Sequence, residues 1–261
     1  MEEEKQYQTE WEAGTTEEEE ELGEDKRGKL VLKIGAVIIL LAFVAFSYAW
    51  QPIFWPPNLD FLKQDQTLSE EELVRQCKPA VVNLQVIKTA GPRTIGQGTG
   101  FNLEPEGKIV TNRHVVEGAS SVEIIFSDGN RFFSRDIELI DGYDLAIIRI
   151  NGNNLPTIPV VNNRLVEVGQ TVTIIGNPMG FQRISARGEV ESYFKTKTGM
   201  LVFTITALIA PGSSGSPVLD GTGHLVGIVF ATGTVTIDGE DHSRALAIPA
   251  TAMSQIAKDL D

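Results

Sequence analysis

The strongest constraint on the fold is a series of short Val- and Ile-rich runs after residue 80, separated from one another by Gly, Pro, Asn and Asp. Such runs, bounded by turn residues, are typical of β-strands. They form two sets, 81–88, 98–103, 109–111, 121–126, 131–140 and 145–150, then 171–175, 185–193, 200–206, 216–219, 225–231 and 245–248. Two sets of six short strands predict an all-β fold of two packed six-stranded β-barrels, over about 80–150 and 160–250.

Helical patterns flank this body. A short amphipathic segment precedes the first strand, and residues 251–260 place Met253, Ile256, Ala257 and Leu260 on one helical face. The second pattern predicts a closing helix. The folded domain is therefore expected to cover residues 70–261, with no residues left for a further domain.

The first 29 residues are rich in Glu and contain little that could form a core, so we expect an acidic, disordered tail. A solvated tail is the plain interpretation, and a docking tail for a basic partner is the alternative. Roughly half of the formal net charge of −13 falls within residues 1–57. The remainder is mildly acidic and has no Lys/Arg cluster, which argues against nucleic acid as a partner.

An apolar stretch over residues 30–50 follows the tail, with Lys33 as its only charge. About 20 apolar residues span a bilayer as a helix, and the basic residues over 26–33 indicate a cytoplasmic N-terminus. We therefore predict a single-pass cell-membrane anchor, contacting lipid through residues 30–50, with the folded domain outside the cytoplasm. Cleavage of a signal peptide after Ala49 is the alternative. Residues 51–69 contain three prolines and are predicted to form a stalk.

The chain has one cysteine, Cys77, and three histidines. One thiol makes no internal disulfide, and no Cys/His spacing suits a metal. We expect a half-buried apolar residue at Cys77, with an intermolecular disulfide as the weaker alternative. No metal and no cofactor is implied.

The segment APGSSGSP, residues 210–217, carries three serines among small residues. Acyl transfer needs a nucleophile and donors for the developing oxyanion. A tight Gly-x-Ser-Gly turn supplies both, with Ser214 as nucleophile and the N–H groups of Gly212 and Ser214 as donors; Ser213 lies between them in this oxyanion hole. Taken alone, a Gly/Ser/Pro segment is more often only a turn.

A base and an acid precede this segment. His114 lies within an apolar stretch, whereas His224 and His242 lie in polar turns. Asp144 begins an apolar strand, where a carboxylate needs a donor such as an imidazole N–H. A structural histidine and a turn aspartate are the plain alternatives, and Asp141 is the natural candidate for the turn.

The order His114, Asp144, Ser214 resembles that of trypsin-like, chymotrypsin-fold serine proteases, and TNRHVV, YDLAII and PGSSGSP resemble their HtrA/DegP-like branch. GTGF, IGNPMG and LVGI support the resemblance, which covers roughly residues 70–259. It implies a double β-barrel whose cleft holds Ser214 as nucleophile, His114 as base and Asp144 as its orienter. It also implies a homotrimer, which nothing in the sequence itself indicates.

Two features depart from that family. Ser216 replaces a glycine beside the nucleophile, which raises a question about the geometry of the oxyanion hole. Many members carry a PDZ domain after the protease, whereas we expect none here.

The resemblance also places substrate-binding residues before the nucleophile and on the strand after it. They are Leu208, Ile209, Ile228, Val229, Phe230 and Ala231. None is acidic, so we expect cleavage after small or medium aliphatic residues rather than after Lys or Arg.

These features predict a membrane-anchored serine endopeptidase that hydrolyses unfolded or damaged extracytoplasmic proteins through an acyl-enzyme. The alternative is an inactive protease-fold scaffold or peptide-binding module, against which the complete triad argues. An α/β-hydrolase esterase is excluded, because 212–216 lacks the final glycine and the strand-to-helix context of that motif.

Overall fold

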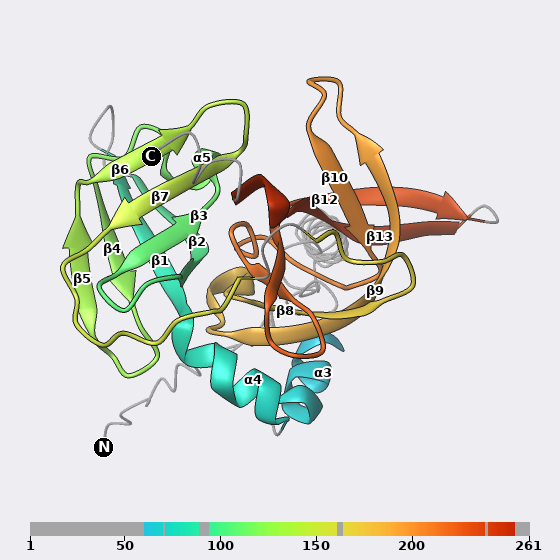
Figure 1. Cartoon of the computed structure of the whole chain (residues 1–261), viewed down its shortest axis with the longest axis horizontal. Helices are drawn as coiled ribbons and strands as arrows, with labels where there is room; N and C mark the ends of the chain where they lie inside the picture. Colours follow the sequence, from blue (N-terminus) through green and yellow to red (C-terminus); the bar gives the residue numbers. More distant parts are fainter. Residues whose placement is uncertain (1–59, 70, 89–93, 161–163, 238–239, 254–261) are drawn as a thin grey trace, which may run out of the picture. The chain divides into compact units, whose positions relative to one another are not determined.

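The computed structural model describes residues 60–69, 71–88, 94–160, 164–237 and 240–253 (Figure 1). Asn58–Asp261 forms one compact unit. The predicted acidic tail, the predicted membrane helix over 30–50 and residues 254–260 of the predicted closing helix lie outside the described residues. Within the described ranges, no helix combines the length and the apolar character needed to cross a membrane.

Two helices, α3 (Asp60–Leu68) and α4 (Glu72–Cys77), precede the sheets, and the 3₁₀ turn η1 (Lys78–Ala80) follows them. Helix α3 packs on strand β9. There Asp65 Oδ1 accepts the backbone N–H of Ser185 at 2.8 Å, and the Gln64 amide exchanges two hydrogen bonds with the backbone of Arg187. The segment predicted as a stalk, 51–69, therefore ends in a helix attached to the folded domain.

The first half is a seven-stranded antiparallel sheet of order β5-β4-β1-β2-β3-β7-β6. Its elements are β1 (Val81–Lys88), β2 (Thr94–Asn102), β3 (Lys108–Thr111), the short helix α5 (Arg113–Val116), β4 (Ser121–Ile125), β5 (Arg131–Ser134), β6 (Ile137–Ile140) and β7 (Leu145–Arg149).

The predicted closed barrel of six strands is wrong for this half. The run 131–140 divides into β5 and β6, and hydrogen bonds of the Ser134 hydroxyl hold the turn between the two strands. Its oxygen donates to the Arg149 carbonyl at 2.6 Å and accepts the Asp136 N–H at 3.1 Å. The sheet thus gains a strand and ends in two edges, β5 and β6.

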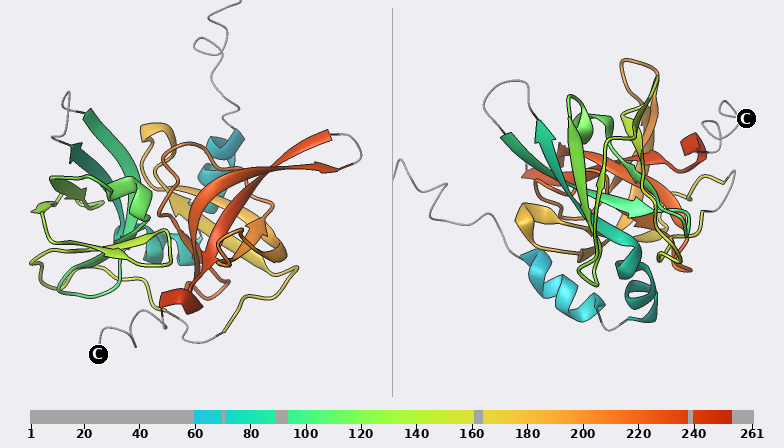
Figure 2. Two further views of the ribbon diagram at one scale, coloured as in Figure 1. Left: turned by 90° about the horizontal axis from the view of Figure 1, so that it is seen from above. Right: turned by 90° about the vertical axis from the view of Figure 1, so that its left-hand side faces the viewer.

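The second half is a closed barrel of order β10-β13-β12-β11-β8-β9, which confirms the prediction of six strands there. Its elements are β8 (Thr171–Gly176), the 3₁₀ turn η2 (Pro178–Gly180), β9 (Ile184–Lys195), β10 (Leu201–Ile205), β11 (Pro217–Leu219), β12 (Leu225–Ile237) and β13 (Glu240–Pro249). Strands β12 and β13 continue beyond the barrel as a projecting hairpin (Figure 2).

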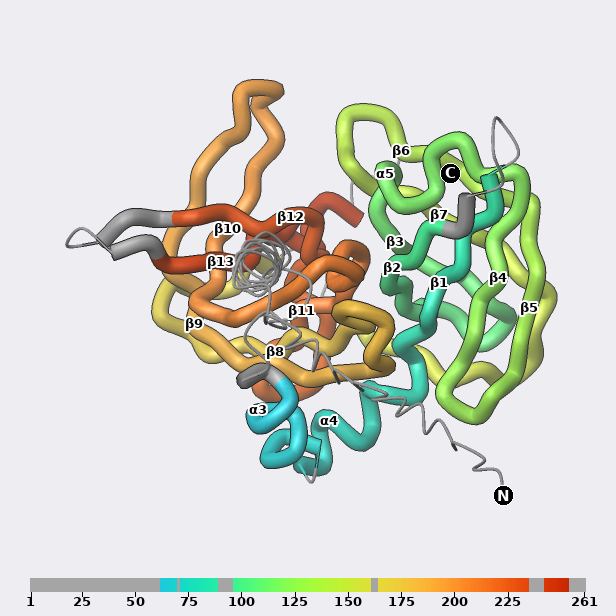
Figure 3. Tube along the Cα trace, turned by 180° about the vertical axis from the view of Figure 1, so that it is seen from behind, coloured from blue at the N-terminus to red at the C-terminus, as the bar shows by residue number. Residues whose placement is uncertain are grey.

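One apolar cluster joins the two halves. It contains Phe101 and Leu145 from the first sheet together with Ile175 and Ile228 from the barrel, all at most 1% exposed. The helical turn at 251–253 adds Met253 to the same cluster. Figure 3 shows α4 leading from α3 on the barrel to β1 of the first sheet. Burying this shared cluster fixes the position of one half against the other, and the candidate site lies at their junction.

Candidate active site

His114 and Asp144 meet in the first half. Helix α5 presents His114 directly after β3, and Asp144 stands directly before β7, which pairs with β3. The Asp144 carboxylate binds His114 twice, with Oδ2 2.6 Å from the ring Nδ1 and Oδ1 accepting the backbone N–H at 2.9 Å. A third bond holds the aspartate's backbone, because the Asn112 amide donates to the Asp144 carbonyl at 2.8 Å. With Nδ1 engaged, the ring has Nε2 left to accept a proton.

Ser214 comes from the second half, in the turn before β11, and Thr99 of β2 joins this turn to the first sheet. The Thr99 N–H donates to the Ser214 carbonyl at 3.0 Å. Its hydroxyl donates to the Gly212 carbonyl at 2.8 Å and accepts the Asn177 N–H at the same distance. Among the described residues, Ser214 Oγ makes no hydrogen bond to His114, a contact that in free enzymes often tightens only with substrate.

Two glycines allow this turn to lie so close to its neighbours. Gly215 has φ +85°, and a Cβ there would stand 2.0 Å from the Thr99 carbonyl oxygen. Gly212 has φ +98°, and a Cβ there would stand 2.6 Å from the Asn177 carbonyl oxygen. Residues other than glycine rarely adopt a positive φ, and neither position has room for a Cβ atom. The requirement for glycine at 212 and 215 is therefore both conformational and steric.

The backbone donors around Ser214 differ in availability. The Ser213 N–H donates to the Ala210 carbonyl at 3.1 Å, so it is occupied. Over the described part of the chain, no acceptor is bound to the N–H of Gly212 or of Ser214. Of the three residues predicted for the oxyanion hole, Gly212 and Ser214 thus have free donors, and Ser213 does not.

Ser216, which stands where the family has a glycine, lies against strand β8. Its side chain is fully buried, and Oγ lies where a Cβ on Gly176 of β8 would be only 2.2 Å away. No described group forms a hydrogen bond with this hydroxyl. Its backbone is regular, donating to Ser213 and accepting from Val229. The extra hydroxymethyl group therefore fits against a glycine of the neighbouring strand.

A cavity of about 290 Å³ opens beside Ser214. Three of the predicted substrate-binding residues line it, namely Ile209, Val229 and Ala231. The other three do not line it. Ile228 is fully buried in the core, Phe230 packs against that core, and Leu208 lines a separate, narrow crevice. No charged side chain of the described residues lines the cavity.

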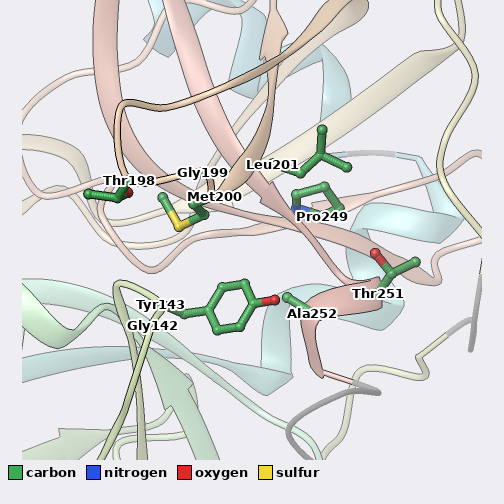
Figure 4. Close-up of a pocket in the computed structure, with 9 residues that line it drawn as sticks. All are labelled: Gly142, Tyr143, Thr198, Gly199, Met200, Leu201, Pro249, Thr251 and Ala252. Atoms are coloured by element: carbon green, nitrogen blue, oxygen red, sulfur yellow. The ribbon is translucent and has the colours of Figure 1, made fainter.

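A second cavity, of about 380 Å³, is lined by Gly142 and Tyr143, which directly precede Asp144 in the sequence (Figure 4). The turn at Tyr143, the β9–β10 hairpin and the segment after β13 line it, and Figure 4 shows the Tyr143 ring extending toward Ala252. Among the described residues, its lining carries hydroxyl groups but no charged side chain. Its described lining contains none of the three candidate catalytic residues, whereas Ser214 lines the first cavity. In the described ranges, no cluster of His, Cys, Asp and Glu suits a metal ion.

Sequence reasoning missed the residues that assemble the turn. Thr99 and Asn177 stood only inside supporting motifs, yet they make the contacts described above, and Asn177 also donates to the Val82 carbonyl at 2.8 Å. Thr232 lines the cavity and was likewise missed. The available signal was a polar residue flanked by glycines in an apolar strand, as in Gly98-Thr99-Gly100.

Comparison with known proteins agrees with the trypsin-like resemblance of the sequence. Residues 98–228, which contain His114, Asp144 and Ser214, match the trypsin-like peptidase domain. The chain belongs to this family. Similar members include the putative serine protease HhoB of Synechocystis sp., 31% identical over 65% of this chain and 41% of that protein. Serine endoprotease DegS of Haemophilus influenzae is 29% identical over 66% of this chain and 54% of that one.

Solved structures of serine proteases have the same fold. The serine endoprotease from Yersinia pestis matches with a TM-score of 0.59 and 26% identity, over 72% of this chain and 65% of that one. The chain spans about half or less of the length of the two curated trypsin-like relatives named above.

Proposed function

We propose that this trypsin-like peptidase domain is a serine endopeptidase. The observation that carries the proposal is the double hydrogen bond between Asp144 and His114, at 2.6 and 2.9 Å, next to a nucleophile turn joined to the same sheet through Thr99. A carboxylate on Nδ1 fixes the tautomer in which Nε2 accepts a proton.

The mechanism follows from this arrangement. Ser214 Oγ attacks the substrate carbonyl, and His114 Nε2 takes its proton. The N–H groups of Gly212 and Ser214 stabilise the oxyanion, since they have no other acceptor in the described residues. The protonated His114 then gives its proton to the leaving amine, which leaves an acyl-enzyme on Ser214. Water then hydrolyses this ester, with His114 again as the base, and Asp144 stabilises the imidazolium during both acylation and deacylation.

The cavity beside Ser214 supports a preference at the cleaved residue. Its 290 Å³ and the side chains of Ile209, Val229 and Ala231 suit a small or medium aliphatic side chain. Burying a Lys or Arg there would leave its charge without a partner, which is costly. We therefore propose cleavage after small or medium aliphatic residues such as Ala, Val and Leu.

We further propose that the protease acts on unfolded extracytoplasmic proteins while anchored in the cell membrane. The support is the apolar stretch at 30–50, the basic residues before it and similarity to proteins that include a probable periplasmic serine endoprotease DegP-like from Chlamydia pneumoniae. A homotrimer remains a proposal based on the family resemblance. Membrane fractionation of a chain with an N-terminal tag distinguishes an anchor, which keeps the tag, from a cleaved signal peptide.

A fluorophosphonate probe tests the activity directly. The full chain should incorporate one label, located on Ser214 by peptide mapping, and should hydrolyse casein. Ser214→Ala should lose both properties, whereas Ser213→Ala, one residue away and buried, should keep the label. A folded chain that never incorporates the probe would instead identify the protein as an inactive scaffold.

A further inference from the structure

Asn112, between β3 and α5, is a buried residue whose amide is only half used. The side chain is fully buried, and its Nδ2 donates one hydrogen bond, to the Asp144 carbonyl at 2.8 Å. No group in the described ranges donates to its Oδ1. Asparagine is favoured at helix N-caps, yet at this N-cap position the side chain makes no capping bond to α5. A buried amide oxygen without a donor lowers stability, so the fold alone does not account for this side chain.

Asn102, at the end of β2, shows what a buried structural asparagine does in the same sheet. It is equally buried, but both ends of its amide are paired. Its Nδ2 donates to the carbonyls of Glu104 and Pro156, at 2.8 and 2.9 Å, and its Oδ1 accepts the Lys108 N–H at 2.9 Å. These bonds hold loops that contribute no residue to the candidate triad. Asn112 instead directs its one bond to the candidate acid.

The position of Asp144 explains why its backbone needs this bond. The ladder between β3 and β7 ends at the pair Thr111 and Ala146. Beyond that pair β3 turns into α5, and the chain before β7 forms the partly exposed turn 141–144. Asp144 therefore lies outside the strand pairing. The Asn112 amide extends the connection between the two chains up to the residue whose carboxylate contacts the imidazole.

The acid–base pair depends on where this backbone lies. The Asp144 carboxylate accepts hydrogen bonds from Nδ1 and from the backbone N–H of His114. The carboxylate is short and close to its own backbone, so a movement of the turn carries it away from both donors. A displacement of about 1 Å in a catalytic group can lower a rate by about 100-fold.

We propose that Asn112 is a positioning residue for the reaction, which holds the Asp144 backbone so that the carboxylate keeps both contacts with His114. The inference rests on the proposed peptidase function. Asn112 acts through Asp144 and not on the substrate, since it is absent from the described linings of both cavities. Its unpaired Oδ1 is then a loss of stability that the protein retains for the geometry of the site.

Two leucine substitutions test this assignment, because leucine resembles asparagine in shape and lacks its polar atoms. Asn112→Leu should lower kcat by about 10- to 100-fold and leave KM within about 2-fold. The urea midpoint should stay unchanged or rise, because the unpaired oxygen is removed and water can reach the carbonyl of the partly exposed Asp144. Asn112→Ala removes the same donor with less volume, so it should lower kcat to a similar extent.

Asn102→Leu is the matched control. It leaves three backbone groups without their partners, so the urea midpoint should fall. The value of kcat per folded site should stay that of the unmodified chain. Fluorophosphonate labelling of Ser214 counts the competent sites in each sample, so partial unfolding of a variant does not alter the comparison.

A double-mutant cycle with Asp144→Asn separates positioning from a purely structural role. Once the carboxylate is gone, its position no longer matters, so adding Asn112→Leu should lower kcat by less than about 2-fold further. A structural role would give the same loss in both backgrounds. Hydrolysis of an activated ester keeps the slow variants measurable. In addition, the low-field proton NMR signal of the His114 Nδ1–H should broaden or move upfield in Asn112→Leu.

The outcomes separate the two proposals. Failure to label Ser214 in the unmodified chain overturns the peptidase function. Normal labelling together with an unchanged kcat in Asn112→Leu overturns only the role of Asn112. A loss of kcat that persists undiminished in the Asp144→Asn background would show that Asn112 does not act through the carboxylate, and it would equally overturn the proposal.

Discussion

The two halves of the protein contribute to the candidate site by different means. The first half contributes side chains, since Asp144 holds His114 through two hydrogen bonds on regular backbone. The second half contributes backbone geometry, since the turn around Ser214 depends on left-handed glycines at 212 and 215. The first sheet is open and the second is a closed barrel. We therefore expect the contribution of the first half to be sensitive to substitutions that change charge. The contribution of the second half should be sensitive to substitutions that change side-chain volume.

The largest expected effect concerns the charge in the first half. Asp144→Asn should lower kcat by about 10⁴-fold, because the amide no longer stabilises the imidazolium or the required tautomer. The free energy of unfolding should change far less. Stopped-flow or steady-state kinetics with a fluorogenic peptide, together with urea unfolding, measure both quantities.

Asp141→Asn is the matched control, three residues earlier on a fully exposed side chain. It should leave kcat within about 2-fold, because an exposed ion pair contributes little. Equal effects of the two variants would refute the division of roles between the halves.

A volume change at the junction should have the next largest effect. Gly215→Ala places a methyl group 2.0 Å from the Thr99 carbonyl oxygen, on a residue with φ +85°. We expect a loss of more than about 3 kcal/mol in the free energy of unfolding. Gly129→Ala has the same conformational cost, at φ +88°, with nothing within 4 Å of the new methyl group. Gly129→Ala should lower the free energy of unfolding by about 1 kcal/mol. Urea unfolding of the two variants therefore isolates the steric part of the Gly215→Ala loss. Equal losses in the two variants would contradict a close contact between the halves.

The difference between local sequence signals and long-range contacts explains which features the sequence could predict. Short apolar runs and turn residues predicted the barrel of the second half, because these signals are local. His114, Asp144 and Ser214 were singled out by their motifs and by the family resemblance. The division of the run 131–140 depended on a hydroxyl contact between Ser134 and the distant Arg149 carbonyl, which no local pattern records.

The cavity lining was predicted only in part for a related reason. Ile228, Val229 and Phe230 are consecutive apolar residues of one strand, and the bulge between Val229 and Ala231 decides which of them face the cavity. Bulges change the direction of side chains without a clear mark in composition. The contacts of Thr99 and Asn177 link residues 78 positions apart, and only the folded chain brings them together.

A smaller effect should mark the attachment of α3 to the second half. Burial alone raises the pKa of Asp65, but hydrogen bonds from Lys78, the Ser185 N–H and Ser69 outweigh it and lower the pKa below 3.8. The carboxylate therefore stabilises the fold above about pH 4, and this stabilisation is lost as the pH falls through the lowered pKa. Asp65→Asn should cost about 1–2 kcal/mol at pH 7.

The pH dependence identifies the cause. The difference between Asp65→Asn and the unmodified chain should shrink steadily below pH 4 in urea unfolding curves. Glu72→Gln, which removes an exposed partner of Arg75, should cost well under 1 kcal/mol. A deficit of Asp65→Asn that stays constant down to pH 2 would show that shape, rather than charge, attaches α3 to β9.

The smallest expected effect concerns Ser216, and it tests whether volume or polarity matters in the nucleophile's turn. Its buried hydroxyl has no described hydrogen-bond partner, and the same holds for Ser185 on β9, away from the turn. Removing an unpaired buried hydroxyl should be neutral or stabilise the fold by up to about 1 kcal/mol. Ser216→Ala and Ser185→Ala should therefore shift the unfolding midpoint alike and leave kcat/KM unchanged. Because the Ser216 side chain packs against Gly176 rather than toward the cavity, a drop in kcat with Ser216→Ala alone would mean that this hydroxyl shapes the oxyanion hole after all.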